Sequence, residues 1–279
     1  MTGPTKLLEL ETALKSLWGA SQWPFGAAVE KPYASPAFQE TRRRLEQLVA
    51  VRACGLLHGP NGVGKTLLVQ HFLQSLPDKR YKPLVLSHSS LTGSDLLRLL
   101  CAELGQSPRM RRGDNVLLIR QGWQQLERLW PLVIIDEGQN LSATALEEVR
   151  LLTCDRRDTQ PPFSLLLIGD EQLLPRLQLG INAPLLARLS FCLHLQLWTV
   201  PELSAYIEWR LQEVGIHANP FEAAALQLLL QAGRGLPRLL NHLAQRALEQ
   251  AASQNSRAVT AAHMQQALEL LPWVTQLAP

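Results

Sequence analysis

The sequence has few of the features that mark secreted, membrane-spanning or disordered proteins. Its four cysteines are scattered over 279 residues without a CxxC pair, which excludes a disulfide framework and a zinc site of that kind. No apolar run approaches the roughly 18 residues of a membrane span. Charges interrupt the N-terminus too early for a secretory signal. We therefore expect a cytoplasmic protein with reduced thiols that makes no contact with a membrane.

Charge is also scarce. Charged residues make up 18% of the chain and hydrophobic residues 46%, a balance that favours a folded core over disorder. The formal net charge is only +3, which is compatible with an anionic partner but does not require one.

The order of apolar segments predicts an α/β fold. Five short apolar runs alternate with helical patterns, as in a parallel β-sheet flanked by helices. After Thr199 only helical patterns follow, so we place a domain boundary there. The sequence is divided into three parts: an N-terminal helix and linker (1–36), an α/β core (37–199) and an all-α domain (200–279). The predicted strands are Cys54–His58, Leu84–His88, Leu132–Ile135, Ser164–Ile168 and Phe191–Leu197.

A phosphate-binding loop follows the first predicted strand. The residues that fit G-x-x-x-x-G-K-[ST] are Gly59, Pro60, Asn61, Gly62, Val63, Gly64, Lys65 and Thr66. The glycines let backbone N–H groups face the phosphates, and the next helix adds its N-terminal dipole. Lys65 supplies charge to the β- and γ-phosphates, and Thr66 offers a hydroxyl to Mg²⁺. ATP and Mg²⁺ are therefore the predicted cofactors.

Two acids end the third predicted strand. Asp136 is placed to hold Mg²⁺, and Glu137 is placed to act as general base on the attacking water. Both follow the carboxyl end of a strand, where open α/β sheets bind ligands. Asp170 follows the fourth strand and is a candidate sensor of the γ-phosphate, although an ordinary turn residue is an equal interpretation.

Four stretches resemble the ExeA-type AAA+ ATPases, which include general secretion pathway protein A. They are the phosphate loop, IIDEGQNL (134–141), LEEVRLL (146–152) and GLPRLLNHL (235–243). They are also similar to transposition regulators of the TnsC, TniB, IstB and MuB kind. The resemblance implies an AAA+ P-loop core followed by an all-α lid domain. It also implies an arginine finger at Arg188 and a sensor-2 arginine at Arg238. One departure is that family members usually have Gln-Pro-Glu where this chain has residues 170–172.

The resemblance leaves three functions open. Secretion members carry a membrane anchor and a wall-binding domain, which this sequence lacks, so we favour a transposition regulator. Such a protein forms an ATP-dependent ring or filament on double-stranded DNA, selects target DNA and recruits or activates a transposase. The alternatives are a soluble secretion or assembly ATPase and a nucleotide-dependent signalling switch, both without DNA.

Basic clusters are the direct sequence support for DNA binding. Arg109, Arg111 and Arg112 lie in a predicted loop, and Arg156 and Arg157 follow a predicted helix. Arginines on loops that line a pore would neutralise DNA phosphates. An ordinary solvated surface is the alternative interpretation of each cluster. Tryptophans on apolar faces favour core packing over base stacking.

Overall fold

The structure is a computed structural model that describes residues 12–26, 32–87, 90–154 and 161–272. The chain divides into two compact units. The sheet unit comprises residues 36–61 and 65–196, and the helical unit comprises residues 1–35, 62–64 and 197–279. The N-terminal segment thus joins the helices after residue 197 instead of standing apart from them. The physical reason is that Leu14, Ala20 and Phe25 are buried in the core of those helices.

The sheet unit is built on five strands in the order β2-β3-β4-β1-β5. All four neighbouring pairs are parallel, so the carboxyl ends of the strands share one edge. Parallel strands buried on both faces are expected to be continuously apolar, and β1, β3 and β4 meet that expectation. The strands are β1 (Cys54–His58), β2 (Tyr81–Leu86), β3 (Trp130–Ile135), β4 (Ser164–Gly169) and β5 (Leu189–His194).

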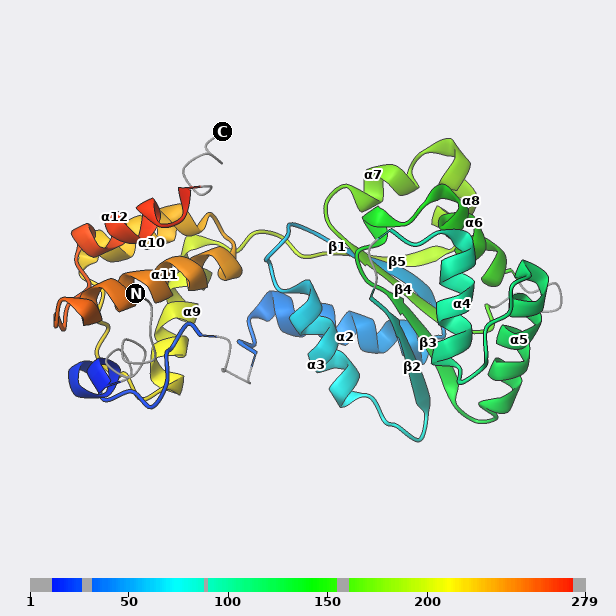
Figure 1. Cartoon of the computed structure of the whole chain (residues 1–279), viewed down its shortest axis with the longest axis horizontal. Helices are drawn as coiled ribbons and strands as arrows, with labels where there is room; N and C mark the ends of the chain where they lie inside the picture. Colours follow the sequence, from blue (N-terminus) through cyan, green and yellow to red (C-terminus); the bar gives the residue numbers. More distant parts are fainter. Residues whose placement is uncertain (1–11, 27–31, 88–89, 155–160, 273–279) are drawn as a thin grey trace. The chain divides into compact units, whose positions relative to one another are not determined.

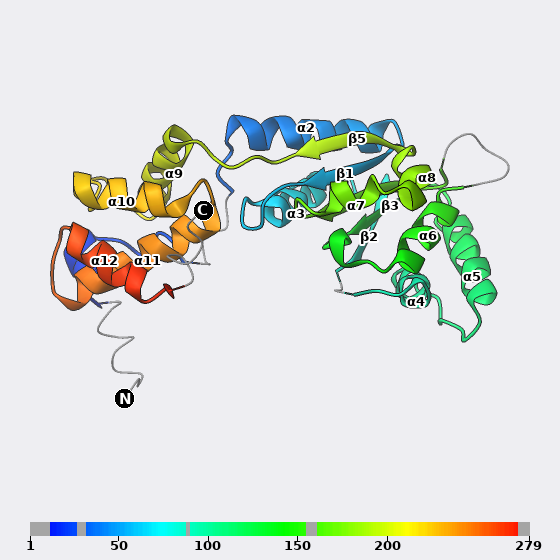
Figure 2. The ribbon, with the colours of Figure 1, turned by 90° about the horizontal axis from the view of Figure 1, so that it is seen from above.

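Helices cover both faces of this sheet (Figures 1 and 2). The helices α2 (Pro36–Ala50) and α3 (Lys65–Ser75) lie on one face. The opposite face is covered by α4 (Gly93–Glu103), α5 (Arg112–Gln125), α6 (Ala143–Leu152), α7 (Leu173–Leu177) and α8 (Ala183–Leu186). Two 3₁₀ turns, η1 (Gly138–Asn140) and η2 (Gly180–Asn182), complete the unit.

The two faces are packed by alternate residues of each strand, as the pleat requires. Cys54 and Leu56 of β1 belong to the cluster formed with α4 to α8. Gly55, between them, faces α2, and a Cβ there would lie 2.5 Å from Leu48 Cδ1. The close approach of α2 to β1 therefore depends on a glycine.

The helical unit is formed by α9 (Val200–Glu213), α10 (Ala223–Gly233), α11 (Pro237–Ser253) and α12 (Ala261–Glu269), together with the helix at 12–18. Thr199 caps α9 in a reciprocal arrangement with Glu202, which fixes where this helix begins. Tyr33, Trp198 and Trp209 form an aromatic cluster around Tyr206. Core packing of these tryptophans, the interpretation favoured by the sequence, is confirmed.

The parallel sheet and the four C-terminal helices match the fold class expected from the sequence. Several predicted boundaries differ. β2 begins at Tyr81 instead of Leu84, and the basic segment is not all loop, because α5 begins at Arg112. The short helices α7 and α8 were not predicted, since five and four residues are too few to show helical periodicity. Among the described residues, no helix combines the length and hydrophobicity needed to cross a bilayer.

Candidate active site

The phosphate loop connects β1 to α3 through glycines in unusual conformations. Gly59, Gly62 and Gly64 have φ values of +149°, +89° and +109°, which residues with side chains rarely adopt. At Gly59 the chain also runs against Leu195, the residue after β5, and a Cβ would lie 2.1 Å from its carbonyl oxygen. The motif spacing therefore describes a real backbone requirement at these positions.

Lys65 is the first residue of α3 and is buried, with only 8% of its surface exposed. Its Nζ donates to the carbonyl oxygens of Gly59 (2.8 Å) and Pro60 (3.0 Å), so the ammonium lies within the loop itself. Thr66 follows on the exposed side of the helix. A buried ammonium beside a glycine-rich turn at a helix N-terminus is suited to a polyphosphate.

A histidine precedes this loop. His58, the last residue of β1, stacks on His194 of β5 with ring centroids 4.6 Å apart. Burial, and then the neighbouring His194, lower the pKa of His58 below its usual 6.5. The ring is thus neutral near pH 7 and adds no charge of its own beside the loop.

Asp136 and Glu137 follow β3 at the same edge of the sheet. Asp136 accepts a hydrogen bond from the backbone N–H of Glu137 at 2.9 Å. Glu137 has a left-handed backbone (φ +54°), and its exposed carboxylate accepts from Gln139 Nε2 at 2.5 Å. Since β4 alone separates β3 from β1, the two acids and the phosphate loop border one stretch of the edge.

Asp170 follows β4, between those two elements. Its carboxylate accepts from the backbone N–H of Gln172 at 2.9 Å, which closes a local turn. Its own N–H donates to Gln139 Oε1 at 3.2 Å. These contacts suit the turn interpretation, and the sensor role of Asp170 stays a prediction.

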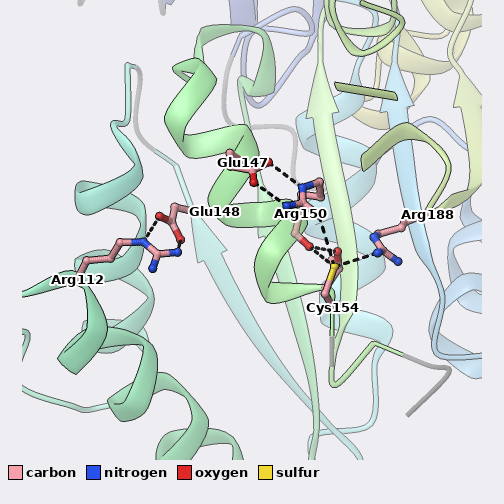
Figure 3. A network of polar contacts seen from close by, with 7 residues as sticks. Arg112, Glu147, Glu148, Arg150, Cys154 and Arg188 are labelled. Atoms are coloured by element: carbon pink, nitrogen blue, oxygen red, sulfur yellow. Dashed lines mark hydrogen bonds and ion pairs between the residues drawn. The ribbon is translucent and has the colours of Figure 1, made fainter. Parts of the chain in front are cut away.

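Arg188 lies at the amino end of the strands, opposite the end that carries the phosphate loop. It precedes β5, whose first residue, Leu189, pairs with Cys54 at the start of β1. The phosphate loop follows the other end of β1, a strand length of about 16 Å away. Arg188 is exposed, and its Nη2 donates to Cys154 Sγ at 2.9 Å (Figure 3). Arg188 is therefore too far from the phosphate loop of its own sheet to act on a nucleotide there.

Arg238 is the second residue of α11 in the helical unit. Its backbone N–H donates to the carbonyl oxygen of Gly62 at 3.3 Å, and Gly62 to Gly64 group with this unit. A Cβ on Gly62 would lie 3.2 Å from the Cβ of Arg238. The lid arginine predicted from the sequence is thus next to a glycine of the phosphate loop.

The arginines predicted to bind DNA are not equivalent. Arg112 forms a two-point ion pair with Glu148 of α6, through Nε and through Nη2 at 2.8 Å (Figure 3). Glu148 is almost buried, so its carboxylate needs this guanidinium, and the pairing raises the pKa of Arg112. The Arg112 guanidinium is thus engaged with Glu148, although 51% of the side chain is exposed, and its role in DNA binding stays a prediction. Arg109 and Arg111 are exposed. Arg156 and Arg157 lie outside the described residues.

A groove of about 890 Å³ lies between α5 and α6, and the Arg112–Glu148 pair is part of its wall. Its other lining residues include Trp123, Leu151 and Pro162. The groove does not include the phosphate loop or the acid pair, which are placed by the carboxyl ends of β1 and β3. The candidate site at these strand ends is therefore defined by its backbone geometry and charged groups.

Two residues near the acids were not identified from the sequence. Gln139 contacts both Glu137 and Asp170, and the Arg176 guanidinium donates to the carbonyl oxygens of Gln139 and Leu141. Gln139 lies within the run IIDEGQNL and could have been noticed there. Arg176 carries no comparable signal, because its role depends on α7, which the sequence did not reveal.

Known proteins share both this sequence pattern and this geometry. Residues 49–177 match the family model described as an AAA domain. The general secretion pathway protein A of Aeromonas hydrophila is 33% identical over 210 residues, which is 73% of this chain and 38% of that protein. The chain carries an AAA domain of the ExeA type. It spans little more than a third of the length of this relative.

Solved structures show the same fold at low sequence identity. Cdc6p from Pyrobaculum aerophilum is 14% identical with a TM-score of 0.72, covering 92% of this chain and 74% of that one. The Aeropyrum pernix ORC1 protein, solved in complex with DNA, is 18% identical with a TM-score of 0.67. That match covers 89% of this chain and 69% of the other. These likenesses establish the P-loop AAA+ fold for an ExeA-type chain.

Proposed function

We propose that this AAA+ protein binds ATP with Mg²⁺ and hydrolyses it to ADP and phosphate. The observation that supports this most directly is the shared edge: a glycine loop with a buried lysine and an acid pair are carried by strands only one strand apart. Lys65 and the loop N–H groups would hold the phosphates. Glu137 would accept the proton of the attacking water.

The donors fit Mg²⁺ by their chemistry. A threonine hydroxyl and a carboxylate are the hard oxygen ligands, direct or through water, that this ion takes. Thr66 and Asp136 would hold the ion, and bound Mg²⁺ would neutralise charge on the β- and γ-phosphates. Arg238 would contact the phosphates from the lid and link lid position to the bound nucleotide.

The position of Arg188 supports a site completed by a second copy of the chain. An exposed arginine at the far edge of the sheet is remote from its own phosphate loop but available to a neighbour's nucleotide. ATP-dependent assembly into a ring or filament follows from this role. Hydrolysis would then rise faster than linearly with protein concentration.

We further propose that the assembly binds double-stranded DNA, with selection of target DNA for a transposase as the specific role. The supporting residues are the exposed Arg109 and Arg111, and the structurally similar ORC1 protein was solved in complex with DNA. A net charge of +3 gives one subunit little attraction for DNA, so several subunits would need to bind together. The relative in the general secretion pathway supports a second candidate, an assembly ATPase that does not use DNA.

The deciding experiment measures ATP hydrolysis and DNA binding together. Phosphate release is followed with and without duplex DNA, and fluorescence anisotropy of labelled DNA is followed with a non-hydrolysable ATP analogue or ADP. We expect DNA binding only with the analogue and faster hydrolysis with DNA. Lys65→Ala is the control and should abolish ATP binding. Hydrolysis without any DNA effect would favour the secretion candidate, and no ATP binding by the unaltered protein would refute the proposal.

A further inference from the structure

Gln139 joins the two strand ends that flank the proposed site of hydrolysis. It belongs to η1, the short turn directly after the acid pair. Its amide nitrogen donates to Glu137 Oε2 at 2.5 Å, and its amide oxygen accepts from the backbone N–H of Asp170 at 3.2 Å. One planar amide therefore fixes the candidate base on β3 relative to the end of β4.

The backbone around this amide is closely packed. A Cβ on Gly169 would lie 2.8 Å from Gln139 Oε1 and 2.5 Å from Leu173 Cδ2. A Cβ on Gly138 would lie 3.2 Å from the Ile168 carbonyl oxygen. A side chain on Gly169 would displace the Gln139 amide and Leu173, and one on Gly138 would fit only tightly, so the turn after β3 lies close against the end of β4.

A guanidinium fixes the same turn from outside. Arg176 of α7 donates through Nη1 to the Gln139 carbonyl oxygen and through Nη2 to that of Leu141. Asn182 Nδ2 in turn donates to the Arg176 carbonyl oxygen at 2.9 Å. The main chain of Gln139 is therefore fixed independently of its side chain, which leaves the amide as the link between the carboxylate and Asp170.

The Glu137 carboxylate has particular need of such a link. Its backbone is left-handed and its side chain is exposed, so without a partner the carboxylate would sample several rotamers. A general base must lie within hydrogen-bond reach of the water that it deprotonates. An amide donor on Oε2 fixes the carboxylate and leaves Oε1 to accept the proton.

We propose that Gln139 is a positioning residue for ATP hydrolysis, which holds Glu137 against the attacking water and ties it to the end of β4. This rests on the proposed ATPase function. In this role the amide acts through Glu137 and not on the reacting atoms. Its removal should lower kcat and leave nucleotide affinity unchanged, because Lys65 and the phosphate loop are not part of the link.

Three variants separate the two halves of the amide. Gln139→Ala removes both contacts. Gln139→Glu retains an acceptor for the Asp170 N–H but sets a negative charge against Glu137. Gln139→Asn is one methylene too short to reach both partners. All three should lower kcat by about tenfold or more, with the affinity for a fluorescent ATP analogue within about twofold of the unaltered protein. Gln178→Ala, an exposed glutamine on the C-terminal side of α7, is the matched control and should match the unaltered kcat.

A double-mutant comparison tests whether Gln139 acts through Glu137. In the Glu137→Ala background, Gln139→Ala should cause no further loss of kcat, because the group that it positions is gone. An additional tenfold loss there, or an unaltered kcat in the single variant, would overturn the proposal while ATP hydrolysis itself stands.

A measurement without turnover keeps the test independent of the proposed function. The side-chain NH₂ signals of Gln139 are identified in a ¹H–¹⁵N spectrum by their loss in Gln139→Ala. Hydrogen bonding to a carboxylate should shift one of these protons downfield and slow its exchange, and Glu137→Ala should reverse both effects. Signals at the position of free glutamine amides that ignore Glu137→Ala would refute the link, whether or not the protein hydrolyses ATP.

Discussion

The carboxyl edge of the sheet and the basic segment at the start of α5 use their charged groups in opposite ways. At the edge, the two acids follow directly from the end of β3, and Lys65 follows β1 through a glycine loop of fixed spacing whose carbonyl oxygens hold its ammonium. In the basic segment, Arg112 is half exposed and forms an ion pair with an almost buried Glu148. A motif with fixed spacing therefore predicts where a charge is placed, whereas a cluster of like charges does not show which of them are free.

The largest effect that tests this difference is the loss of ATP hydrolysis when the acid pair at the carboxyl ends of the strands is altered. Glu137→Gln should retain ATP binding and lower hydrolysis by at least about 100-fold, because only the proton acceptor is lost. Binding is measured by titration with a fluorescent ATP analogue and hydrolysis by phosphate release. Turnover close to that of the unaltered protein would remove Glu137 from the role of base.

The next largest effect is a slower ATP hydrolysis when Arg188, at the amino end of the strands, is removed. Arg188→Ala should bind ATP normally and hydrolyse it at least about tenfold more slowly, because a neighbour's site lacks its cation. Mixing this variant with the inactive Glu137→Gln variant should restore part of the hydrolysis. In a mixed assembly, an intact Arg188 can face an intact Glu137. No recovery at any mixing ratio would argue against a site shared between copies.

In the basic segment we expect a loss of stability when Arg112 is removed. Arg112→Ala leaves the Glu148 carboxylate almost buried without its cation, and should lower the free energy of unfolding by about 2 kcal/mol. Arg112→Ala combined with Glu148→Gln should be less destabilising than Arg112→Ala alone. Urea denaturation measures both, and equal stability of Arg112→Ala and the unaltered protein would contradict the structural role.

DNA affinity separates Arg112 from its neighbours. Arg109→Ala with Arg111→Ala should weaken DNA binding in the presence of the ATP analogue, and should flatten its log–log salt dependence by about 0.9 for each phosphate that is no longer neutralised. Arg112→Ala should leave that slope unchanged at a temperature where it remains folded. If Arg112→Ala alone alters the salt dependence, Arg112 itself contacts DNA phosphates.

The smallest effect is a pH dependence from the strand that leads into the phosphate loop. The pKa of His58 in the folded protein lies below its ordinary value of 6.5. The unfolded state therefore binds more protons between these two values, and stability falls as pH decreases through about 6.5 toward the folded pKa. His58→Asn should reduce this acid loss relative to the unaltered protein in melts at pH 7.5 and 5.5. If both proteins lose the same stability between pH 7.5 and 5.5, groups other than His58 cause the loss.

Much of the sheet unit could be predicted because buried parallel strands leave a strong pattern. The strand Cys54–His58 has the predicted bounds, and the glycine loop has the expected backbone. The relation of the N-terminal segment to the lid helices could not be predicted, because Leu14 and Phe25 give no sign of which distant apolar face covers them.

The candidate site was predictable where a residue follows a strand and not where it depends on a partner. Asp136 and Glu137 are placed by the end of β3. Arg112 and Glu148 are far apart in sequence, and nothing in either neighbourhood indicates the other. The same holds for the hydrogen bond from the Asp170 N–H to the Gln139 side chain, since it depends on β3 and β4 being adjacent.

The strand order also has a consequence for how the protein becomes active during folding. The strand β1 lies between β4 and β5, so residue 54 must meet residues 165 and 189. The paired strands β2 and β3 are nearer to each other in the chain. Closing such long loops is slow, and strands paired in this way tend to come together late. The phosphate loop can be completed only when β5 lies against Gly59. Nucleotide binding should therefore begin with the final pairing step, and ATP added during refolding should stabilise the product without accelerating the earlier phases.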